Sequence, residues 1–177
     1  MLMTKDKIYG EKRRALILQW LEESEEPLTG GDLSDRTNVS RQVIVQDISL
    51  LKAKNHPIIA TSQGYLYMPT RIEPTASRVI AVKHTPDETA HELNTIVDHG
   101  VTIRNVVVEH AIYGEITGSL MLQSRKDVSQ FLKKLAEQEA SLLSDLTGGV
   151  HLHTLEASSE SVLDEVIAAL KKEGYLL

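Results

Sequence analysis

The stretch LTGGDLSDRTNVSRQVIVQDISLLKAKNHPIIATSQGYLYMP, Leu28 to Pro69, decides the fold of the first part of the chain. Thr29 stands directly before the segment GGDLSDR, and Ser40 stands directly before RQVIVQDISLLKAKN. Threonine and serine are favoured N-cap residues, so a short helix and then a longer one are expected here. The apolar residues of the longer helix recur near the helical period and predict its buried stripe: Val43, Ile44, Ile48 and Leu51.

A β-hairpin is predicted after the longer helix. Pro57 follows that helix, and two short apolar runs, Ile58–Thr61 and Tyr65–Met68, flank the turn Ser62-Gln63-Gly64. Ahead of both helices, a helical pattern covers Lys5–Glu23. The apolar residues of that pattern are Ile8, Ala15, Leu16, Leu18 and Leu21. Three helices and a hairpin in this order predict a winged helix-turn-helix domain over residues 1–70.

A winged helix-turn-helix binds DNA through the start of its third helix, which enters the major groove, while the hairpin contacts the adjacent backbone or minor groove. Arg41 is suited to guanine, and Gln42 or Gln46 to adenine. The candidate DNA-binding residues are Ser40, Arg41, Gln42, Gln46 and Gln63. The alternative is a small helical interaction module without affinity for DNA.

The composition is that of an ordinary globular protein. Of the 177 residues, 41% are hydrophobic and none is cysteine, which excludes disulfides and thiolate metal sites. No apolar run reaches the roughly 18 residues of a membrane span, so a soluble, cytoplasmic protein is expected. Residues 1–72 carry ten Lys and Arg against nine Asp and Glu, whereas the remainder carries nine against sixteen. The net charge of −6 therefore lies in the second part and permits a DNA-binding face in the first.

Residues 71–177 are predicted to form a second domain, after a short linker bracketed by Pro69 and Pro74. The expected strands are Arg78–His84, Ile103–His110, Glu115–Gln123 and the run that opens after Gly148-Gly149. The expected helices are Pro86–Asp98, residues 125–140 and Ser158–Glu173. The order β-α-β-β-α-β-α predicts an α+β fold, a two-layer sandwich with its helices on one face of the sheet.

Two histidines in the sequence GGVHLH lie one residue apart on a predicted strand. His151 and His153 then share one face of the strand, because side chains alternate with a period of two. His84 ends the first strand of this domain, and Glu92 lies on the second turn of the next helix, so these side chains can converge. Three imidazoles and one carboxylate suit Zn²⁺, Ni²⁺, Mn²⁺ or Fe²⁺. A polar strand face without metal is the alternative, and His91 competes with Glu92 but points about 100° away around the helix.

Three segments of the second domain resemble the three-histidine domain of niacin-responsive transcription repressors of the NiaR type. They are RVIAVKHTPDETAHELNTIVDHG, VVVEHAIYGEITGSLML and LTGGVHLHTLEA. The helix-turn-helix is similar to the one that opens many biotin-ligase-type bacterial regulators, so the resemblance covers nearly the whole chain. It implies a divalent metal held by His84, Glu92, His151 and His153, nicotinate as co-repressor, and operators before niacin-uptake or NAD-synthesis genes.

The effector site and the competing functions stay open beside this resemblance. His110 and Tyr113, in the motif HAIYGEI, are candidate nicotinate-binding residues, and two copies of the chain are expected to bind two half-sites as a homodimer. A metal-responsive repressor and a metal-dependent hydrolase are alternatives. A hydrolase would need a general base, and the only candidates are Glu109 and Glu115, near the motif HAIYGEI. A biotin-ligase-type enzyme is a further alternative, but the second domain is too short for that catalytic domain and lacks an adenylate-binding loop, which argues against it. We therefore expect no enzymatic activity, although nicotinamide or another pyridine remains an alternative effector.

Overall fold

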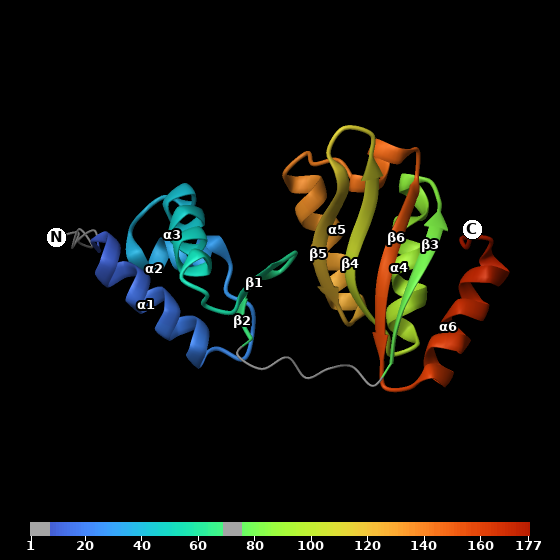
Figure 1. Cartoon of the computed structure of the whole chain (residues 1–177), viewed down its shortest axis with the longest axis horizontal. Helices are drawn as coiled ribbons and strands as arrows, with labels where there is room; N and C mark the ends of the chain where they lie inside the picture. The colour runs from blue at the N-terminus through green and yellow to red at the C-terminus, as the bar shows by residue number, and fades with distance from the viewer. Residues whose placement is uncertain (1–7, 69–75) are drawn as a thin grey trace. The chain divides into compact units, whose positions relative to one another are not determined.

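A computed structural model describes residues 8–68 and 76–177 of the chain. The chain divides into two compact units, Met1–Arg71 and Ile72–Leu177 (Figure 1). The predicted linker between Pro69 and Pro74 lies outside the described residues, as does the predicted start of the first helix at Lys5. Within the described ranges, no helix combines the length and the apolar character needed to cross a membrane.

The N-terminal unit contains three helices and a two-stranded hairpin, in the predicted order. The elements are α1 (Gly10–Glu23), α2 (Gly30–Thr37), α3 (Arg41–Ala53), β1 (Ile58–Thr61) and β2 (Gly64–Tyr67) (Figure 1). The two strands are antiparallel, with Ile58 opposite Tyr67 and Thr61 opposite Gly64. The predicted helix-turn-helix with its following hairpin is confirmed.

Helix α1 differs from the prediction in its start and in its buried face. Ile8 and Tyr9 lie ahead of the helix, whose first backbone hydrogen bond runs from Arg13 N–H to the Tyr9 carbonyl (2.8 Å). Ala15 was expected to be buried but is exposed, and Ile17 is fully buried instead. The buried face is shifted because Arg13, one helical turn before Ile17, is itself buried against an acidic partner on α3.

Both helix starts predicted from capping residues are confirmed. Thr29 Oγ1 accepts a hydrogen bond from Asp32 N–H, and the Asp32 carboxylate accepts one from Thr29 N–H, each at 3.0 Å. Ser40 Oγ accepts a hydrogen bond from Val43 N–H at the start of α3 (3.4 Å). These caps satisfy N–H groups that the helices leave unpaired. The core beneath them is aliphatic: Ile17, Leu21, Leu33, Ile44, Ile48, Leu51 and Ile58.

A buried ion pair joins α1 to α3. Arg13 Nε donates to Asp47 Oδ2 at 2.5 Å, and Arg13 Nη1 donates to the carbonyl of Ile8 at 2.6 Å. The two paired side chains are only 8% and 3% exposed. Arg14 adds a second, more exposed contact to Asp47 at 3.3 Å. The pair therefore fixes α3, the predicted DNA-reading helix, against α1.

Replacing Asp47 with alanine should destabilise the N-terminal unit by about 3–5 kcal/mol, because the Arg13 guanidinium would stay buried without its partner. Urea denaturation followed by the fluorescence of Trp20 measures this, since the single tryptophan of the chain lies on α1. Arg14→Met is the control and should cost less than about 1 kcal/mol, because that side chain is partly solvated. Equal costs for both variants would contradict a dominant Arg13–Asp47 pair.

The C-terminal unit is a four-stranded antiparallel sheet with the strand order β3-β6-β4-β5. Its strands are β3 (Ala76–Lys83), β4 (Thr102–His110), β5 (Gly114–Leu122) and β6 (Val150–Ala157). Its helices are α4 (Thr89–Asp98), α5 (Arg125–Glu137) and α6 (Glu160–Glu173), with short 3₁₀ helices η1 (Pro86–Glu88) and η2 (Leu143–Thr147). The predicted α+β class and the β-α-β-β-α-β-α order are confirmed.

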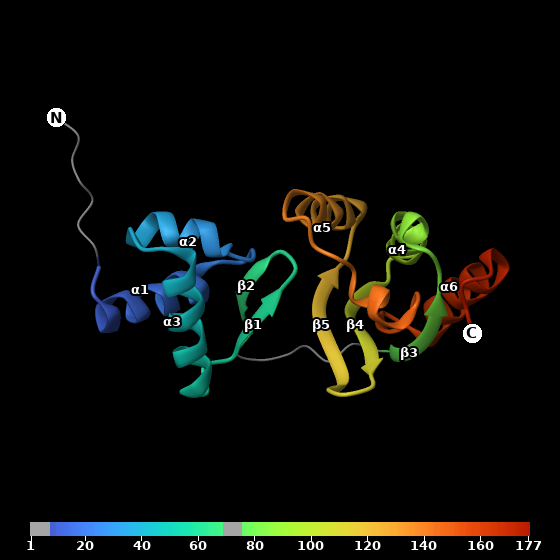
Figure 2. The same ribbon diagram turned by 90° about the horizontal axis from the view of Figure 1, so that it is seen from above.

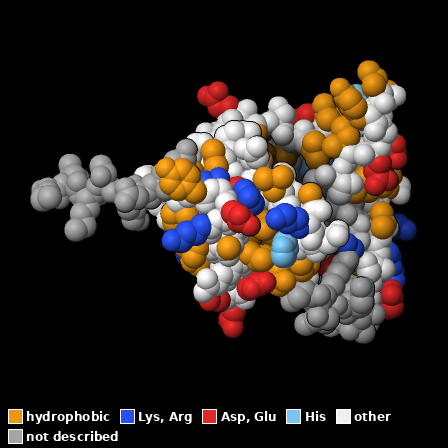
Figure 3. All heavy atoms as spheres, turned by 60° about the vertical axis from the view of Figure 1, so that its left-hand side comes forward, with side chains coloured by type: hydrophobic (Ala, Val, Ile, Leu, Met, Phe, Trp, Pro, Cys, Tyr) orange, Lys and Arg blue, Asp and Glu red, His pale blue; other side chains and the backbone are white. Residues whose placement is uncertain are grey.

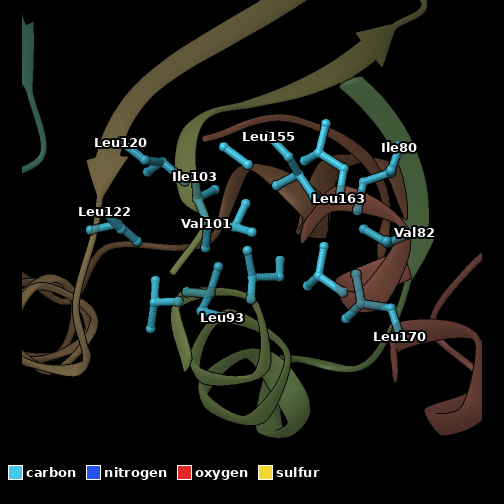
Figure 4. Packing of buried hydrophobic residues seen from close by; sticks show 14 of the residues in the cluster. Ile80, Val82, Leu93, Val101, Ile103, Leu120, Leu122, Leu155, Leu163 and Leu170 are labelled. Carbon is cyan, nitrogen blue, oxygen red and sulfur yellow. The ribbon is translucent and has the colours of Figure 1, made fainter. Parts of the chain in front are cut away.

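The three α-helices of this unit cover one face of the sheet (Figure 2). Side chains from every strand and helix of this unit meet in one aliphatic core, where Leu155 of β6 lies between Ile103 and Ile80 (Figure 4). In the pairing of β3 with β6, Ile80 is opposite His153 and Val82 is opposite His151. Directly opposed residues share a face of the sheet, so both histidines lie on the helix-covered side.

Two local departures from the prediction lie beside the histidines. The helix predicted over Pro86–Asp98 begins as the 3₁₀ turn η1 and becomes α-helical only at Thr89. The 3₁₀ helix η2 was not predicted and leads directly into Gly148, which ends it with a φ of 61°. The remaining boundary errors are one to three residues, as helix and strand ends commonly fray.

Candidate metal centre

Three separate elements bring His84, Glu92, His151 and His153 together. The spacing predicted that His84 can meet Glu92 and that His151 lies beside His153, and the pairing of β3 with β6 joins the two pairs. His84 directly follows β3, Glu92 lies on the buried face of α4, and the two other histidines lie on β6. One ligand atom each from His84, Glu92 and His151 lies within 4.8 Å of the others. His153 Nε2 lies 3.5 Å from Glu92 Oε1, which places the fourth residue in the same cluster. We call these four residues the cage.

The cage is almost closed to solvent. The Glu92 side chain is completely buried, and those of His84 and His153 are each 2% exposed. His84 Nε2 lies 3.5 Å from Glu92 Oε2, and His151 Nε2 lies 3.2 Å from His153 Nε2. Polar groups buried this deeply normally have partners, because an unpaired one is costly.

The outer nitrogen of every cage histidine is held by a backbone carbonyl. His84 Nδ1 lies 2.8 Å from the carbonyl oxygen of Thr85. His151 Nδ1 lies 2.9 Å from the carbonyl oxygen of Gly149, and His153 Nδ1 lies 2.6 Å from that of Asn105. A carbonyl oxygen only accepts hydrogen bonds, so each Nδ1 carries a proton and donates it. In the neutral ring this leaves the Nε2 lone pair free and directed inward, as in histidines that bind metals.

Three inward atoms of the cage lack hydrogen-bond partners among the described residues. His84 Nε2 and both Glu92 carboxylate oxygens are buried and unpaired. The facing Nε2 atoms of His151 and His153 would repel each other if both presented lone pairs. A cation in the cage, either a proton or a metal ion, would relieve both problems. Three imidazole nitrogens and one carboxylate fit a borderline divalent metal, so the residues present suit the ion that the family resemblance implies.

The charges of the cage also favour a cation. Burial alone would raise the pKa of Glu92, but attraction to His153 and His84 outweighs it and lowers the pKa to about 2. Burial, together with repulsion from His153, lowers the pKa of His151 to about 4. Burial also lowers the pKa of His153, but attraction to Glu92 outweighs burial and raises it. At neutral pH the carboxylate is therefore ionised and His151 is neutral, which are the forms that bind metals.

Two residues that support the cage were missed by sequence reasoning. The ladder between β4 and β6 shifts register beside Asn105, whose carbonyl accepts from His153 and whose side-chain oxygen accepts from Thr154 N–H at 2.9 Å. Gly149 leaves no room for a side chain, because a Cβ there would lie 2.3 Å from the His84 carbonyl oxygen. The glycine pair ahead of the predicted strand is a signal that could have identified Gly149, whereas no periodic pattern marks Asn105.

The turn that carries His84 and the glycine turn before β6 border a surface pocket of about 420 Å³. Thr85, Pro86 and Gly148 are among its lining residues, together with His84 and Gly149. The pocket therefore lies next to the cage, because His84 belongs to both and Gly149 precedes the strand that carries His151.

The predicted effector residues lie apart from the cage, in the hairpin between β4 and β5. His110 Nδ1 accepts hydrogen bonds from the N–H groups of Ile112 and Tyr113 at 3.2 and 3.3 Å. The rings of His110 and Tyr113 are in contact, with centroids 5.0 Å apart, and Tyr113 is 77% exposed. His84 directly follows β3, and His110 is the last residue of β4. Because both strands are antiparallel to β6, the two histidines lie at the same end of the sheet.

The predicted DNA-binding residues lie at the surface of the N-terminal unit. Ser40, Arg41, Gln42 and Gln46 are exposed at the start of α3, and Gln63 is half-buried in the turn between β1 and β2. On the face seen in Figure 3, basic side chains are interspersed with acidic and apolar ones instead of forming one continuous patch. This agrees with the near-neutral charge of residues 1–72 and makes hydrogen bonds from α3 the expected source of specificity.

Comparison with known proteins assigns both units to families. Residues 13–66 match a model described as an HTH domain, and residues 77–177 match one described as a 3H domain. The chain is 53% identical over 173 residues to the transcription repressor NadR of Bacillus subtilis, covering 97% of this chain and 96% of that protein. It is 40% identical over 171 residues to the probable transcription repressor NiaR of Thermotoga maritima, covering 97% of each.

Proposed function

The chain belongs to the NadR/NiaR family of transcription repressors, and from that premise we propose that nicotinate acts as its co-repressor. In this proposal the repressor binds operators before niacin-uptake or NAD-synthesis genes in the cytoplasm, and a divalent metal in the cage is required for the response. Two copies bind two half-sites as a homodimer, so nicotinate acts by favouring the arrangement that fits their spacing.

The observation that supports this proposal most is the cage of His84, Glu92, His151 and His153. His84 Nε2 and both Glu92 carboxylate oxygens are buried without hydrogen-bond partners among the described residues, and the outer nitrogens of the three histidines are anchored to backbone carbonyls. These residues would hold the ion and thereby connect β3, α4 and β6. When bound, the ion supplies an electron-pair acceptor for a carboxylate or a ring nitrogen. His110 and Tyr113 are proposed to contact nicotinate from the β4–β5 hairpin, at the same end of the sheet as His84.

Operator binding tests this function when metal and nicotinate are varied separately. Gel shifts would be compared for protein that is metal-free, metal-loaded, given nicotinate alone, or given both. The proposal predicts tight binding only with both present. Tight binding with metal alone would instead identify a metal-responsive repressor, and an equal response to nicotinamide would identify a less selective pyridine site.

The chain is not an enzyme, in agreement with the transcription repressors to which it is related. The general bases considered for a hydrolase, Glu109 and Glu115, are opposed across the β4–β5 pair and exposed. Neither belongs to the described cluster of candidate metal ligands.

Replacing Arg41 with alanine should weaken operator binding by about 10- to 100-fold, since a bidentate contact to guanine contributes about 1–3 kcal/mol. Nicotinate affinity, measured by calorimetry on the same sample, should not change, because Arg41 lies in the other compact unit. Arg125→Ala, which removes an exposed arginine of the C-terminal unit, is the control and should leave operator affinity unchanged. Loss of DNA and nicotinate binding together would indicate misfolding instead of a lost base contact.

A further inference from the structure

Tyr175 contacts the cage from outside, and we infer that it is a positioning residue of the metal centre. It contacts both His84 and helix α4, which carries Glu92, and so keeps the two ligands at the spacing that metal binding requires. This inference rests on the proposed metal-binding role of the cage.

The backbone around Tyr175 is fixed to the end of β3. Gly174 ends α6 with a φ of 81°, and the chain then turns alongside that strand. The Tyr175 carbonyl accepts a hydrogen bond from Lys83 N–H at 2.8 Å, and Leu177 N–H donates to the Ala81 carbonyl at 3.1 Å. These bonds place Tyr175 beside the residue that immediately precedes His84.

The Tyr175 side chain joins two of the elements that build the cage. Its ring lies edge-on to the His84 imidazole, with centroids 5.8 Å apart and an angle of 74° between the planes. Its hydroxyl is hydrogen-bonded to His91 Nδ1 at 3.1 Å, and His91 directly precedes Glu92 on α4. Only 7% of Tyr175 is exposed, so the tyrosine itself belongs to the packed interior.

This arrangement also explains the role of His91, which competed with Glu92 as a ligand in the sequence. The His91 side chain is 63% exposed and lies 3.2 Å from the carboxylate of Glu173 on α6. It therefore points away from the cage and toward α6. With Tyr175 and Glu173 as its partners, His91 ties α4 to the segment that supports His84.

Such a brace matters because only a long polar contact joins His84 and Glu92 inside the cage. His84 Nε2 and Glu92 Oε2 are 3.5 Å apart, and neither atom has a hydrogen-bond partner in the described part of the chain. Contacts outside the cage therefore help to set their spacing before metal binds. Residues that orient metal ligands in this way typically change metal affinity by 10- to 100-fold when removed.

Cobalt binding by the full chain, measured by competition with a coloured chelator, tests this role. Tyr175→Leu removes both ring and hydroxyl and should weaken Co²⁺ binding by about 10- to 100-fold, with a changed visible spectrum of the bound ion. Tyr175→Phe keeps the ring against His84 and should weaken binding by only about 2- to 10-fold, with the spectrum preserved. Tyr9→Leu, the same substitution at an exposed tyrosine of the N-terminal unit, should change neither quantity.

A double-mutant cycle isolates the hydroxyl contact. Tyr175→Phe and His91→Ala remove the same hydrogen bond. The loss of Co²⁺ affinity in the double variant should therefore be smaller than the sum of the losses in the two single variants. If the two losses of affinity were strictly additive, the hydrogen bond between Tyr175 and His91 would not contribute to metal binding, and the proposed connection to α4 would be wrong.

The outcomes separate the inference from its premise. If the unaltered chain bound no Co²⁺, the proposed metal role itself would fail. If the unaltered chain bound Co²⁺ and Tyr175→Leu bound it equally well with an unchanged spectrum, only the positioning role would fail. A loss of affinity that matched the loss of folded protein by circular dichroism, again with an unchanged spectrum, would also overturn it.

Discussion

Replacing Gly149 with alanine should weaken metal binding by more than about 100-fold. The added Cβ would lie 2.3 Å from the His84 carbonyl oxygen, and a backbone atom cannot move aside as a flexible side chain can. Gly149 also has a φ of 91°, which strains any residue with a side chain. Relief of the clash would move either His84 or the start of β6, and both carry cage residues. Two of the three carbonyls that anchor the cage histidines, those of Thr85 and Gly149, lie in the same two turns.

The neighbouring glycine supplies a matched control. Gly148 has a φ of 61°, but a Cβ added there meets no atom within 4 Å. Gly148→Ala should therefore cost about 1–2 kcal/mol of folding stability while leaving metal affinity within about threefold. Both variants would be compared by chelator competition and by thermal unfolding with and without metal. If Gly149→Ala behaved like Gly148→Ala in both measurements, close packing of the two turns would not be needed for the cage.

Replacing Glu92 with glutamine should abolish the rise in melting temperature that metal produces. Glu92 supplies the anionic group of the cage, and its ionised form is favoured by a pKa of about 2. The amide is similar in size but neutral, so the metal loses its charge-balancing ligand while the helix keeps its shape. A ligand that binds the folded state stabilises it by RT ln(1 + [L]/Kd), so a large loss of affinity removes most of the shift.

Glu165→Gln is the control for this experiment, because Glu165 is an exposed residue of α6 away from the cage. It should retain the full metal-dependent shift. Differential scanning calorimetry with a fixed excess of Ni²⁺ or Zn²⁺ would compare the two variants with the unaltered chain. A full shift in Glu92→Gln would show that the ion binds elsewhere.

Local patterns in the sequence predicted most of the fold and the convergence of the cage residues. The period of two in GGVHLH placed His151 and His153 on one face, and β6 keeps both on the helix-covered side. Helical spacing placed His91 about 100° from Glu92, and in the structure these neighbours point to different partners. Capping residues located the starts of α2 and α3 because capping is a local interaction.

The features that could not be predicted depend on contacts between distant parts of the chain. Asn105 anchors His153 from a register shift, and nothing in the alternation of β4 marks that position. Tyr175 is more than ninety positions from His84 along the chain, and only folding brings the two rings together. The buried face of α1 was misplaced because Arg13, a residue type expected at the surface, is buried by its ion pair.

The metal content of the purified chain tests the central claim most directly. The full chain would be loaded with Ni²⁺ or Zn²⁺, desalted and measured by elemental analysis beside His84→Ala and His153→Ala. The cage predicts one ion per chain in the unaltered protein and a large loss of metal in each folded variant, because each substitution removes one of four ligands. Full metal content in both variants would contradict the assignment of the cage as the metal centre.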